Sequence, residues 1–479
     1  MLRLTTVLCA ITAAAYLGGC AVGPTYQRPI VNVPNHWVAQ AADGRWPADD
    51  WWIAFNDPTL DHLVAEGLST NHDLKAAIER VHEAQSLAKV AGAPLFPTVS
   101  AEAGGGRERA FKKNPNKPQR YDDTYTQLGL TASYELDLFG QNRDQLKAAN
   151  AKVESSEFDR DAVRVGLASA VASTYLQLCS ANERLAIARD SLASARDTLD
   201  LVRAQLHGGT ATALQVAQQQ SEAESLAASI PPIETERSRT WDALARLVGT
   251  TPEALDVTPS SLMQMSAPVP PTGLPSALLE RRPDVQKAEA DLRAANADVG
   301  AATAALFPKV NLSAVGGYGT VLGLESLFLP ASQFYGLAVG LSAPLFDGGK
   351  LRGELNYSQA RYQELVENYQ QAAISAFGDV DDALAAERDS QAALEARHVA
   401  TVSAAQASEL ATAQFQQGMA DYLSVLNTQR TVLSARDAEV QARLARLEAA
   451  IGVFQALGGG WSSSGAPKPV AGNDHGPNA

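Results

Sequence analysis

The chain has 479 residues, of which 46% are hydrophobic and 19% are charged, and its formal net charge is −14. Because an acidic surface repels polyanions, this charge excludes a nucleic-acid partner and electrostatic attraction to anionic lipid. Length alone would allow about three domains.

The N-terminus predicts a cleaved secretory signal followed by a lipid attachment site. Residues 1–19 carry one Arg and an apolar core from Val7 to Leu17, which is too short to span a bilayer comfortably. The run Leu-Gly-Gly-Cys20 resembles a lipobox, where the thiol is acylated and the Cys becomes the mature N-terminus. Ala21, in place of the Asp that often retains lipoproteins at the inner membrane, implies transfer to the outer membrane. The alternative is an ordinary signal peptide with an incidental Cys.

Cysteine usage agrees with export. Cys9 would leave with the signal and Cys20 would be lipidated, so Cys179 would be the remaining thiol and no intramolecular disulfide could form. Cys179 lies within a helical pattern, which predicts a packed, small apolar side chain.

Residues 20–56 predict a lipidated, extended segment that lies on the surface of the rest of the protein. The segment is rich in Pro, Trp and Gly and has no periodicity. Its aromatic side chains would be the anchors, since so many rarely stay solvated: Trp37, Trp46, Trp51 and Trp52. Asp57-Pro58 then opens a helix, with Pro at the first helical position.

The chain contains a tandem duplication with an offset of 211 residues. The matching pairs are Asp73 and Asp284, Leu95 and Leu306, and Pro97 and Pro308. At Pro97 and at Pro308 a helical pattern gives way directly to an alternating one, so each copy contains a helix-to-strand junction. We interpret the two junctions as the level where a helical body meets the inner surface of a membrane.

Alternation of apolar and polar residues predicts four amphipathic strands, at about 98–110, 125–139, 308–320 and 333–346. One face of these strands is polar or has very small side chains, which suits a wet lumen: Gln127, Thr131, Ser133, Asn311, Ser313, Gly336, Ala338 and Gly340. A soluble sheet with one solvated face is the alternative on pattern alone.

Each strand pair is followed by a long helical hairpin. The first runs from about 141, turns at 207–210 and returns to a predicted break at Pro231-Pro232. The second runs from about 349, turns at 417–420 and returns to about 457. Its return arm carries apolar residues seven apart, with two interleaved, which predicts lengthwise packing: Leu426, Leu433, Val440, Leu447 and Phe454, with Leu444 and Ile451.

These elements define the expected domains. The first repeat covers 57–249, a Pro-rich linker covers 250–275 and the second repeat covers 276–458. Residues 459–479 have no pattern and are predicted to be disordered.

Four strands cannot close a membrane barrel, and an open edge in lipid leaves unpaired backbone groups that cost several kcal/mol each. The smallest closed barrels have about eight strands. At least two chains must therefore share a barrel.

The sequence resembles the TolC-like outer-membrane efflux factor family, and within it the NodT-type lipoproteins. The resemblance covers essentially the whole mature chain and is carried by these stretches: Cys20 with AVGPTYQRP, Trp51 to Pro58, LDLFG at 136–140, RRPDV to FP at 281–308, PLFDGGKLRGEL at 344–355 and FQQGMADYLSVLNTQR at 415–430. It implies a homotrimer with a twelve-stranded β-barrel in outer-membrane lipid and a periplasmic tunnel of long helices. The implied partners are a periplasmic adaptor protein and an inner-membrane pump of the resistance-nodulation-division type.

The resemblance also assigns two sets of residues. The hairpin turns at Gly208, Gly209 and Gly418 would be the periplasmic tips. Counting from Gly418, the constriction positions fall on Leu423, Ser424 and Asn427, which lack the acidic side chains that many relatives carry there. We expect Leu423 and Asn427 to form a closed constriction.

The predicted function is a passive exit duct for small molecules, driven by the inner-membrane pump. The seven His residues form no metal-binding spacing and no catalytic motif is present, so no enzymatic activity and no cofactor or metal is predicted. Two alternatives stay open: a duct for type I protein secretion, and a periplasmic coiled-coil scaffold or adaptor lipoprotein.

Overall fold

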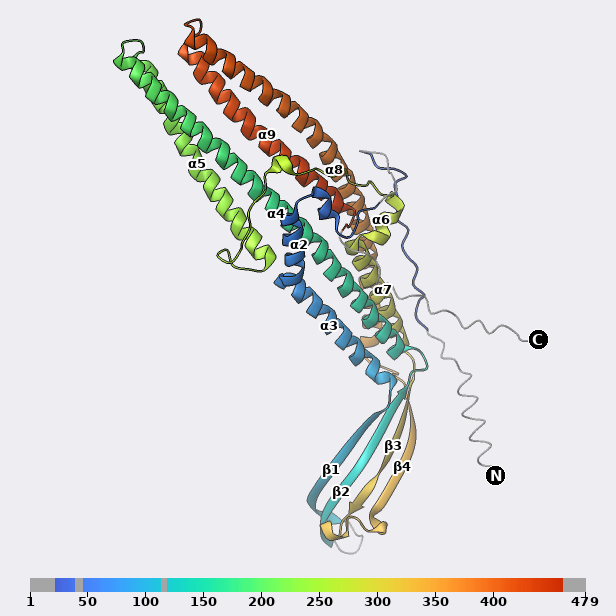
Figure 1. Ribbon diagram of the computed structural model, residues 1–479. Coiled ribbons are helices and arrows are strands. Elements are labelled where there is room, and N and C mark those ends of the chain that lie inside the picture. The colour runs from blue at the N-terminus through green and yellow to red at the C-terminus, as the bar shows by residue number, and fades with distance from the viewer. Residues whose placement is uncertain (1–21, 39–45, 113–118, 460–479) are drawn as a thin grey trace, which may run out of the picture. The chain divides into compact units, whose positions relative to one another are not determined.

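A computed structural model describes residues 22–38, 46–112 and 119–459, so the predicted signal and Cys20 lie outside the described residues. The helices are α2 (Pro58–Thr70), α3 (His72–Gly92), α4 (Gln141–His207), α5 (Ala213–Val248), α6 (Pro275–Arg281), α7 (Pro283–Ala304), α8 (Lys350–Gln416) and α9 (Tyr422–Ala456) (Figure 1). The strands are β1 (Thr98–Lys112), β2 (Gln119–Leu136), β3 (Lys309–Thr320) and β4 (Gln333–Ser342).

The chain divides into two compact units. The sheet unit comprises residues 22–30, 80–157 and 287–370, and the hairpin unit comprises the remaining described residues. The sheet unit holds all four strands, and the hairpin unit holds both helical turns.

The strands form one antiparallel sheet in the order β1-β2-β3-β4. The fourth strand ends at Ser342, so the predicted extent to 346 is wrong. Pro344 has no N–H to donate to a ladder, and the backbone of Gly348 and Gly349 then has positive φ, which turns the chain into α8. The second strand begins six residues earlier than predicted because its added residues pair with the extended end of β1.

The core of the hairpin unit lies around the middle of α4. Tyr175, Leu176 and Leu178 are fully buried there, and α2, α5, α9 and the short 3₁₀ helix Trp51–Phe55 contribute to the same cluster. Cys179 is buried in this core, as predicted, and burial raises the pKa of its thiol to about 12.

Three of the predicted Trp anchors of the N-terminal segment are confirmed. Trp37, Trp51 and Trp52 are buried, and Trp51 stacks on Phe454 of α9 with ring centroids 5.0 Å apart. Trp37 donates its indole N–H to the carbonyl of Thr272 at 2.7 Å. These three side chains therefore pack within the hairpin unit.

The predicted break at Pro231-Pro232 is wrong, because α5 continues through both prolines to Val248. A proline removes one helical N–H donor and crowds the preceding turn. Here both prolines are exposed, and the residues that lose their donors, Ala227 and Ala228, are half-buried and exposed, respectively. Buried residues on both sides, Leu226 and Leu244, keep the helix packed across the interruption.

The heptad pattern of α9 is confirmed. Its positions are buried or packed against buried clusters along the length of the helix: Leu426, Leu433, Val440, Leu444, Leu447, Ile451 and Phe454. After α9, the amide of Gly459 donates to the carbonyl of Phe454 at 2.8 Å, and the rest of the predicted tail lies outside the described residues.

Among the residues that the structure describes, α4 alone contains an 18-residue stretch apolar enough to cross a membrane by length and composition. Of that stretch 56% is buried against the rest of the chain. This burial is what a core helix requires.

Candidate functional site

The sheet has one polar and one apolar face. Directly paired residues of neighbouring strands lie on the same face. The register places on one face all eight residues that the sequence assigned to a polar face. One row across the sheet reads Thr98, Ser133, Ser313, Ala338, and the next row reads Ser100, Thr131, Val315, Gly336.

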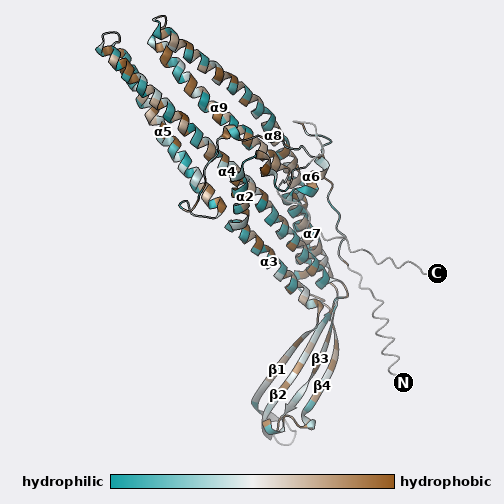
Figure 2. Ribbon diagram, in the orientation of Figure 1, coloured by the Kyte–Doolittle hydropathy of each residue, from teal (hydrophilic) through white to brown (hydrophobic). Residues whose placement is uncertain are grey.

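The opposite face is apolar and unusually exposed. One of its rows reads Val99, Ala132, Ala314, Leu337, and the next reads Ala101, Leu130, Gly316, Tyr335. On β4, Leu337 is 83% exposed and Leu341 is 73% exposed. The apolar residues of the strands can be followed as brown segments in Figure 2. A contiguous exposed apolar surface of this kind marks contact with lipid or with another protein.

Strands β1 and β4 are the two edges of the sheet. Among the described residues, each of them pairs with a strand on one side only, whereas β2 and β3 pair on both sides. The sheet thus offers two unpaired rows of backbone N–H and C=O groups at opposite edges.

A glycine on the polar face keeps β2 and β3 in close contact. A Cβ on Gly317 would lie 2.2 Å from the carbonyl oxygen of Leu128 and 2.6 Å from the Cα of Gly129. Since real Cβ atoms do not approach so closely, only glycine fits at this position without moving β2.

The two predicted junction prolines lie at corresponding places. Pro97 directly precedes β1 and Pro308 directly precedes β3. Beside Pro308, the ring of Phe307 stacks on that of Phe139, which follows β2, with centroids 4.6 Å apart. Lys309 also pairs with Glu135 at 3.3 Å, so the β2–β3 seam is closed at its helical end by aromatic and ionic contacts.

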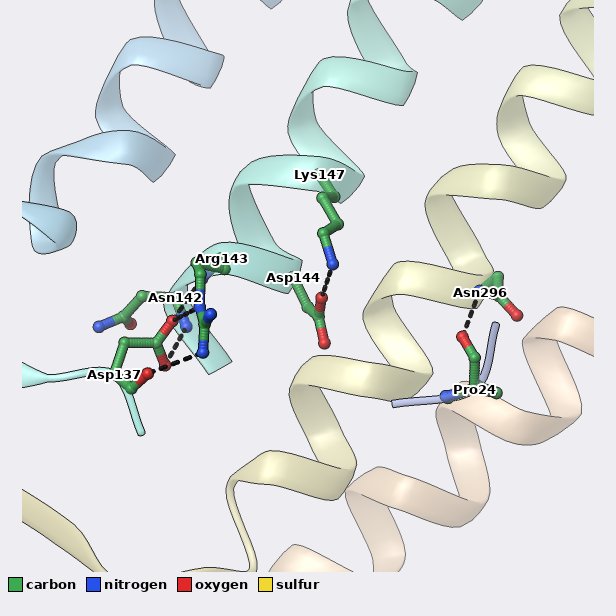
Figure 3. Close-up of polar contacts among 7 residues, drawn as sticks. All are labelled: Pro24, Asp137, Asn142, Arg143, Asp144, Lys147 and Asn296. Atoms are coloured by element: carbon green, nitrogen blue, oxygen red, sulfur yellow. Dashed lines mark hydrogen bonds and ion pairs between the residues drawn. The ribbon is translucent and has the colours of Figure 1, made fainter. Parts of the chain in front are cut away.

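The N-terminal strap, residues 22–30, crosses α7 in the sheet unit. Gly23 and Gly300 meet backbone to backbone, because a Cβ on Gly23 would lie 2.7 Å from the Cα of Gly300. A Cβ on Gly300 would lie 2.5 Å from a carboxylate oxygen of Asp144, which Lys147 holds at 2.8 Å (Figure 3). The crossing therefore leaves no room for a side chain on either partner.

Polar contacts hold the strap against α7 on the C-terminal side of Gly23. Asn296 donates its amide to the carbonyl of Pro24 at 3.0 Å, as Figure 3 shows. Farther along, Arg28 forms an ion pair with Glu289, and Tyr26 donates its hydroxyl to the same carboxylate at 3.3 Å. Strap and helix are thus joined by at least three side-chain contacts among the described residues.

The strand-to-helix corner after β2 is capped by Asp137. Its carboxylate accepts the backbone N–H of Asn142 at 3.2 Å and that of Arg143 at 2.9 Å, and it pairs with the Arg143 guanidinium at 3.1 Å (Figure 3). Negative charge at a helix N-terminus is favourable. This cap fixes the direction in which α4 leaves the sheet.

The two predicted tips have the same backbone. Gly209 and Gly418 both have φ of +74°, a conformation that side-chain-bearing residues rarely adopt. Gly208 still belongs to the helical end, since its amide donates to the carbonyl of Ala204 at 3.0 Å. After the first tip Thr212 forms a capping box with Gln215, and after the second Asp421 caps α9.

The predicted constriction residues lie in the first two turns of α9. Leu423 and Asn427 are exposed on the same helix face, one turn apart. Ser424 is engaged locally, because its amide and its hydroxyl both donate to Asp421, at 2.8 and 2.6 Å. The acidic residue nearest to the tip therefore serves as a helix cap.

Sequence reasoning missed polar links between the two hairpins. Tyr422 of α9 donates its hydroxyl to Gln219 of α5, and Arg184 of α4 pairs with Asp437 of α9 at 2.7 Å. Within the first hairpin, Arg184 also pairs with Glu236 of α5 at 2.9 Å. These partners are far apart in the chain and no spacing signals them. The charged faces of the helices were the only available indication.

Comparison with known proteins identifies the family to which the chain belongs. The sequence profile of the family described as "Outer membrane efflux protein" matches residues 63–250 and 274–459, which is more than half of the chain. The chain belongs to this outer membrane efflux protein family.

Individual relatives agree with the family. The pyoverdine export outer membrane protein OpmQ of Pseudomonas aeruginosa is 38% identical over 462 residues, covering 95% of this chain and 96% of the relative. The toluene efflux pump outer membrane protein TtgI of Pseudomonas putida is 32% identical, covering 94% and 98%. The solved structure of the outer-membrane channel OprN superposes with a TM-score of 0.87 at 31% identity, covering 92% of this chain and all of that one.

The chain is therefore an outer-membrane efflux channel component with a large periplasmic helical portion, and a periplasmic scaffold is excluded as its class. The family consists of channel proteins, and the structural neighbours are trimeric. The predicted fold class is confirmed. Among the described residues, no group of three or more His, Cys, Asp or Glu side chains is arranged to hold a metal ion.

Proposed function

We propose that three copies of the chain close one channel, which conducts small molecules passively across the outer membrane and is coupled to an inner-membrane pump through a periplasmic adaptor. The observation that carries this proposal is the sheet, with its exposed apolar face, its polar face and its two open edges. Each copy supplies four strands, so three copies supply twelve.

Closure explains features that a single chain leaves unexplained. When β4 of one copy pairs with β1 of the next, every backbone group at the edges finds a partner, as lipid requires. The apolar face, with Leu337 and Leu341, then contacts the hydrocarbon, and the polar face lines a lumen. Twelve strands exceed the eight that side chains alone can fill, so the lumen stays open to water.

The tips supply the surface for the adaptor. Gly209 and Gly418 give both tips the same left-handed backbone, and a capped helix begins after each, at Thr212 and at Asp421. Two similar tips per copy give six in a trimer. This arrangement suits repeated adaptor subunits, and the pump in the same assembly would belong to the resistance-nodulation-division class.

Small molecules are the cargo class that the relatives' names favour, since those names specify pyoverdine and toluene. The face assigned to the lumen carries mainly neutral polar side chains, such as Gln127, Thr131 and Ser133, and fewer charged ones, such as Glu102 and Glu135, so it imposes little selectivity. Selectivity would then reside in the inner-membrane pump.

The position of the strap is compatible with lipidation of Cys20. The amide of Val22 donates to the carbonyl of Phe139 at 3.4 Å, beside the β2–β3 junction. Two residues of chain reach at most about 7 Å. An acyl chain on Cys20 would thus enter the bilayer close to the level of Pro97 and Pro308, which we assign to its periplasmic surface. Mass spectrometry of the N-terminal peptide tests whether Cys20 is acylated. An unacylated N-terminus in the outer-membrane fraction would contradict the proposed lipidation.

A constriction formed by Leu423 and Asn427 would keep the resting channel closed. Both side chains are exposed in the single chain and share one helix face, so three copies can bring them together. We expect single-channel conductance in planar bilayers to be low for the wild type and higher for Leu423→Ala. A wild-type pore that is already open, and unchanged by the substitution, would refute the constriction.

Transport is the direct test of the proposed function. In a strain that lacks the chain, accumulation of a panel of small compounds should rise, and complementation should restore export. The Leu337→Arg variant, which is not expected to insert in the membrane, should fail to complement. Unchanged accumulation of every compound in a strain whose other outer-membrane efflux channels are also deleted would contradict the proposal.

A further inference from the structure

Two Phe residues beside the open edges of the sheet are largely exposed in the part of the chain that the structure describes. Phe96 lies just before β1 and is 71% exposed, and Phe346 lies just after β4 and is 93% exposed. Exposure of such large apolar rings at two ends of one sheet calls for an explanation, since each ring buries considerable area when it finds a partner.

The duplication identifies their counterparts. Phe96 corresponds to Phe307 with the offset of 211 that relates Pro97 to Pro308. Gly129-Leu130 of β2 corresponds to Gly336-Leu337 of β4 with an offset of 207, and the same offset relates Phe139 to Phe346. The open-edge residues are thus copies of the two rings that stack on each other at the β2–β3 seam.

The backbone supports this equivalence. The amide of Phe307 donates to the carbonyl of Ala304 at 3.0 Å, and the amide of Phe96 donates to the carbonyl of Ala93, also at 3.0 Å. Ala93 and Ala304 are again 211 residues apart. Both Phe residues are therefore presented by the same turn, between a helix and a strand.

Topology brings the two exposed rings to one place in an assembly. Adjacent strands alternate in direction, so an edge-to-edge pairing of β4 with β1 of the next copy is antiparallel, as β2 with β3 is. The end of β4 then meets the start of β1, and with them the segments that follow and precede these strands. Each such pairing places Phe346 beside Phe96 of the neighbouring copy.

We propose that Phe346 stacks on Phe96 of the adjacent copy and closes each intersubunit seam as Phe139 and Phe307 close the seam within the chain. This inference rests on the proposed trimer and specifies its contact. The occupant of the exposed Phe96 surface is a second copy of this chain. Lipid contact by both rings is the competing outcome.

Cysteine crosslinking tests the contact in the full-length, detergent-extracted protein. A Phe96→Cys/Phe346→Cys variant is treated with a short bis-maleimide and run on a denaturing gel, after native mass spectrometry has established how many copies it contains. The native Cys179 is buried and its thiol stays protonated, so it gives little background. We expect covalent dimers and trimers, and none in either single-cysteine variant.

The matched control is Phe139→Cys/Phe307→Cys, in which the same reagent should join the cysteines without raising the mass beyond one chain.

A second experiment measures dissociation of the trimer on dilution. Phe346→Ala should weaken the trimer by about 2- to 12-fold per pair, in a concentration-dependent way. Phe139→Ala should lower thermal stability without dependence on concentration.

The outcomes separate the inference from the proposed function. A trimer whose open-edge cysteines do not crosslink, while the control pair does, refutes the Phe96–Phe346 contact and leaves the trimer intact; the two rings would then face lipid. A protein that is not trimeric at all refutes the proposed function. Crosslinked trimers together with concentration-dependent weakening by Phe346→Ala support the contact.

Discussion

Helices α4 and α8 have the same length of 67 residues and corresponding places in the two repeats, yet they are buried to different extents. Buried apolar residues extend along α4 from Ala148 to Val202, whereas in α8 all of them except Ala404 lie between Tyr369 and Leu384. Duplication therefore sets which elements form, and the place of an element within the chain decides what covers it.

The strands show the same difference. The seam between β2 and β3 is complete within the chain, with a full ladder and a stacked aromatic pair at its end. The copies of these strands, β4 and β1, form the open edges. The closed seam shows what an open edge lacks, and so indicates what the next copy must supply.

The largest expected effect concerns the two faces of an open-edge strand. Leu337→Arg places a charge on the apolar face of β4, which costs about 2–4 kcal/mol per copy near the middle of a bilayer. Ala338→Arg places the same charge on the polar face. We expect the first variant to abolish, and the second to preserve, heat-modifiable oligomers in outer-membrane fractions. Equal loss in both variants would mean that the faces are assigned wrongly.

The next effect sharpens the contrast between α4 and α8. Leu176→Ala removes a fully buried side chain and should cost about 2–5 kcal/mol in the free energy of unfolding. Leu410→Ala should leave the unfolding of the isolated chain almost unchanged and weaken the oligomer instead. Thermal unfolding measured at several protein concentrations separates a loss of chain stability from a loss of oligomer stability. A large, concentration-independent loss of stability for Leu410→Ala would contradict the difference between α4 and α8.

A smaller effect concerns the strap, which covers α7 at Gly300, whereas the copy of this position in α3 is the exposed Lys89. Gly300→Ala forces Asp144 or the strap to move and should destabilise by about 1–3 kcal/mol. Gly166→Ala, in open space within α4, should stabilise by about 1 kcal/mol. Faster hydrogen exchange of residues 22–28 should accompany Gly300→Ala only, and an unaffected strap would show that the crossing is not tight.

The smallest effect separates the two tips. Hydrogen bonds from the Ser424 side chain and amide lower the pKa of Asp421, so its cap on α9 is complete above the ordinary Asp pKa of about 3.9 and is lost only as the pH falls through the lower folded value. The first tip uses Thr212, which does not titrate. Amide protection at the start of α9 should thus fall in strong acid while that of α5 persists, and Asp421→Ala should show low protection at every pH. Equal acid sensitivity of both tips would contradict this.

Much of this fold follows from periodicity. Strict alternation identified the strands and their faces, because a register shift by one residue would move every apolar side chain to the wrong face. The position of Pro97 and Pro308 at both junctions also followed from sequence, since proline cannot continue a helix.

What the sequence did not show depends on contacts between distant residues. The continuation of α5 through Pro231-Pro232 needs packing on both sides of the prolines. The crossing of Gly23 over Gly300 and the bond between Tyr422 and Gln219 join residues more than 200 positions apart. Phe139 and Phe307 were visible in the motifs, but only the stacked pair revealed what their copies at the open edges lack.

Native mass spectrometry of the protein extracted from outer membranes tests the central claim most directly. If each chain is one third of a closed channel, the predominant species will have the mass of three acylated mature chains, at every protein concentration above the dissociation range. A predominant species of one or two chains would contradict the account, because four or eight strands could not enclose the wide polar lumen that the sheet implies.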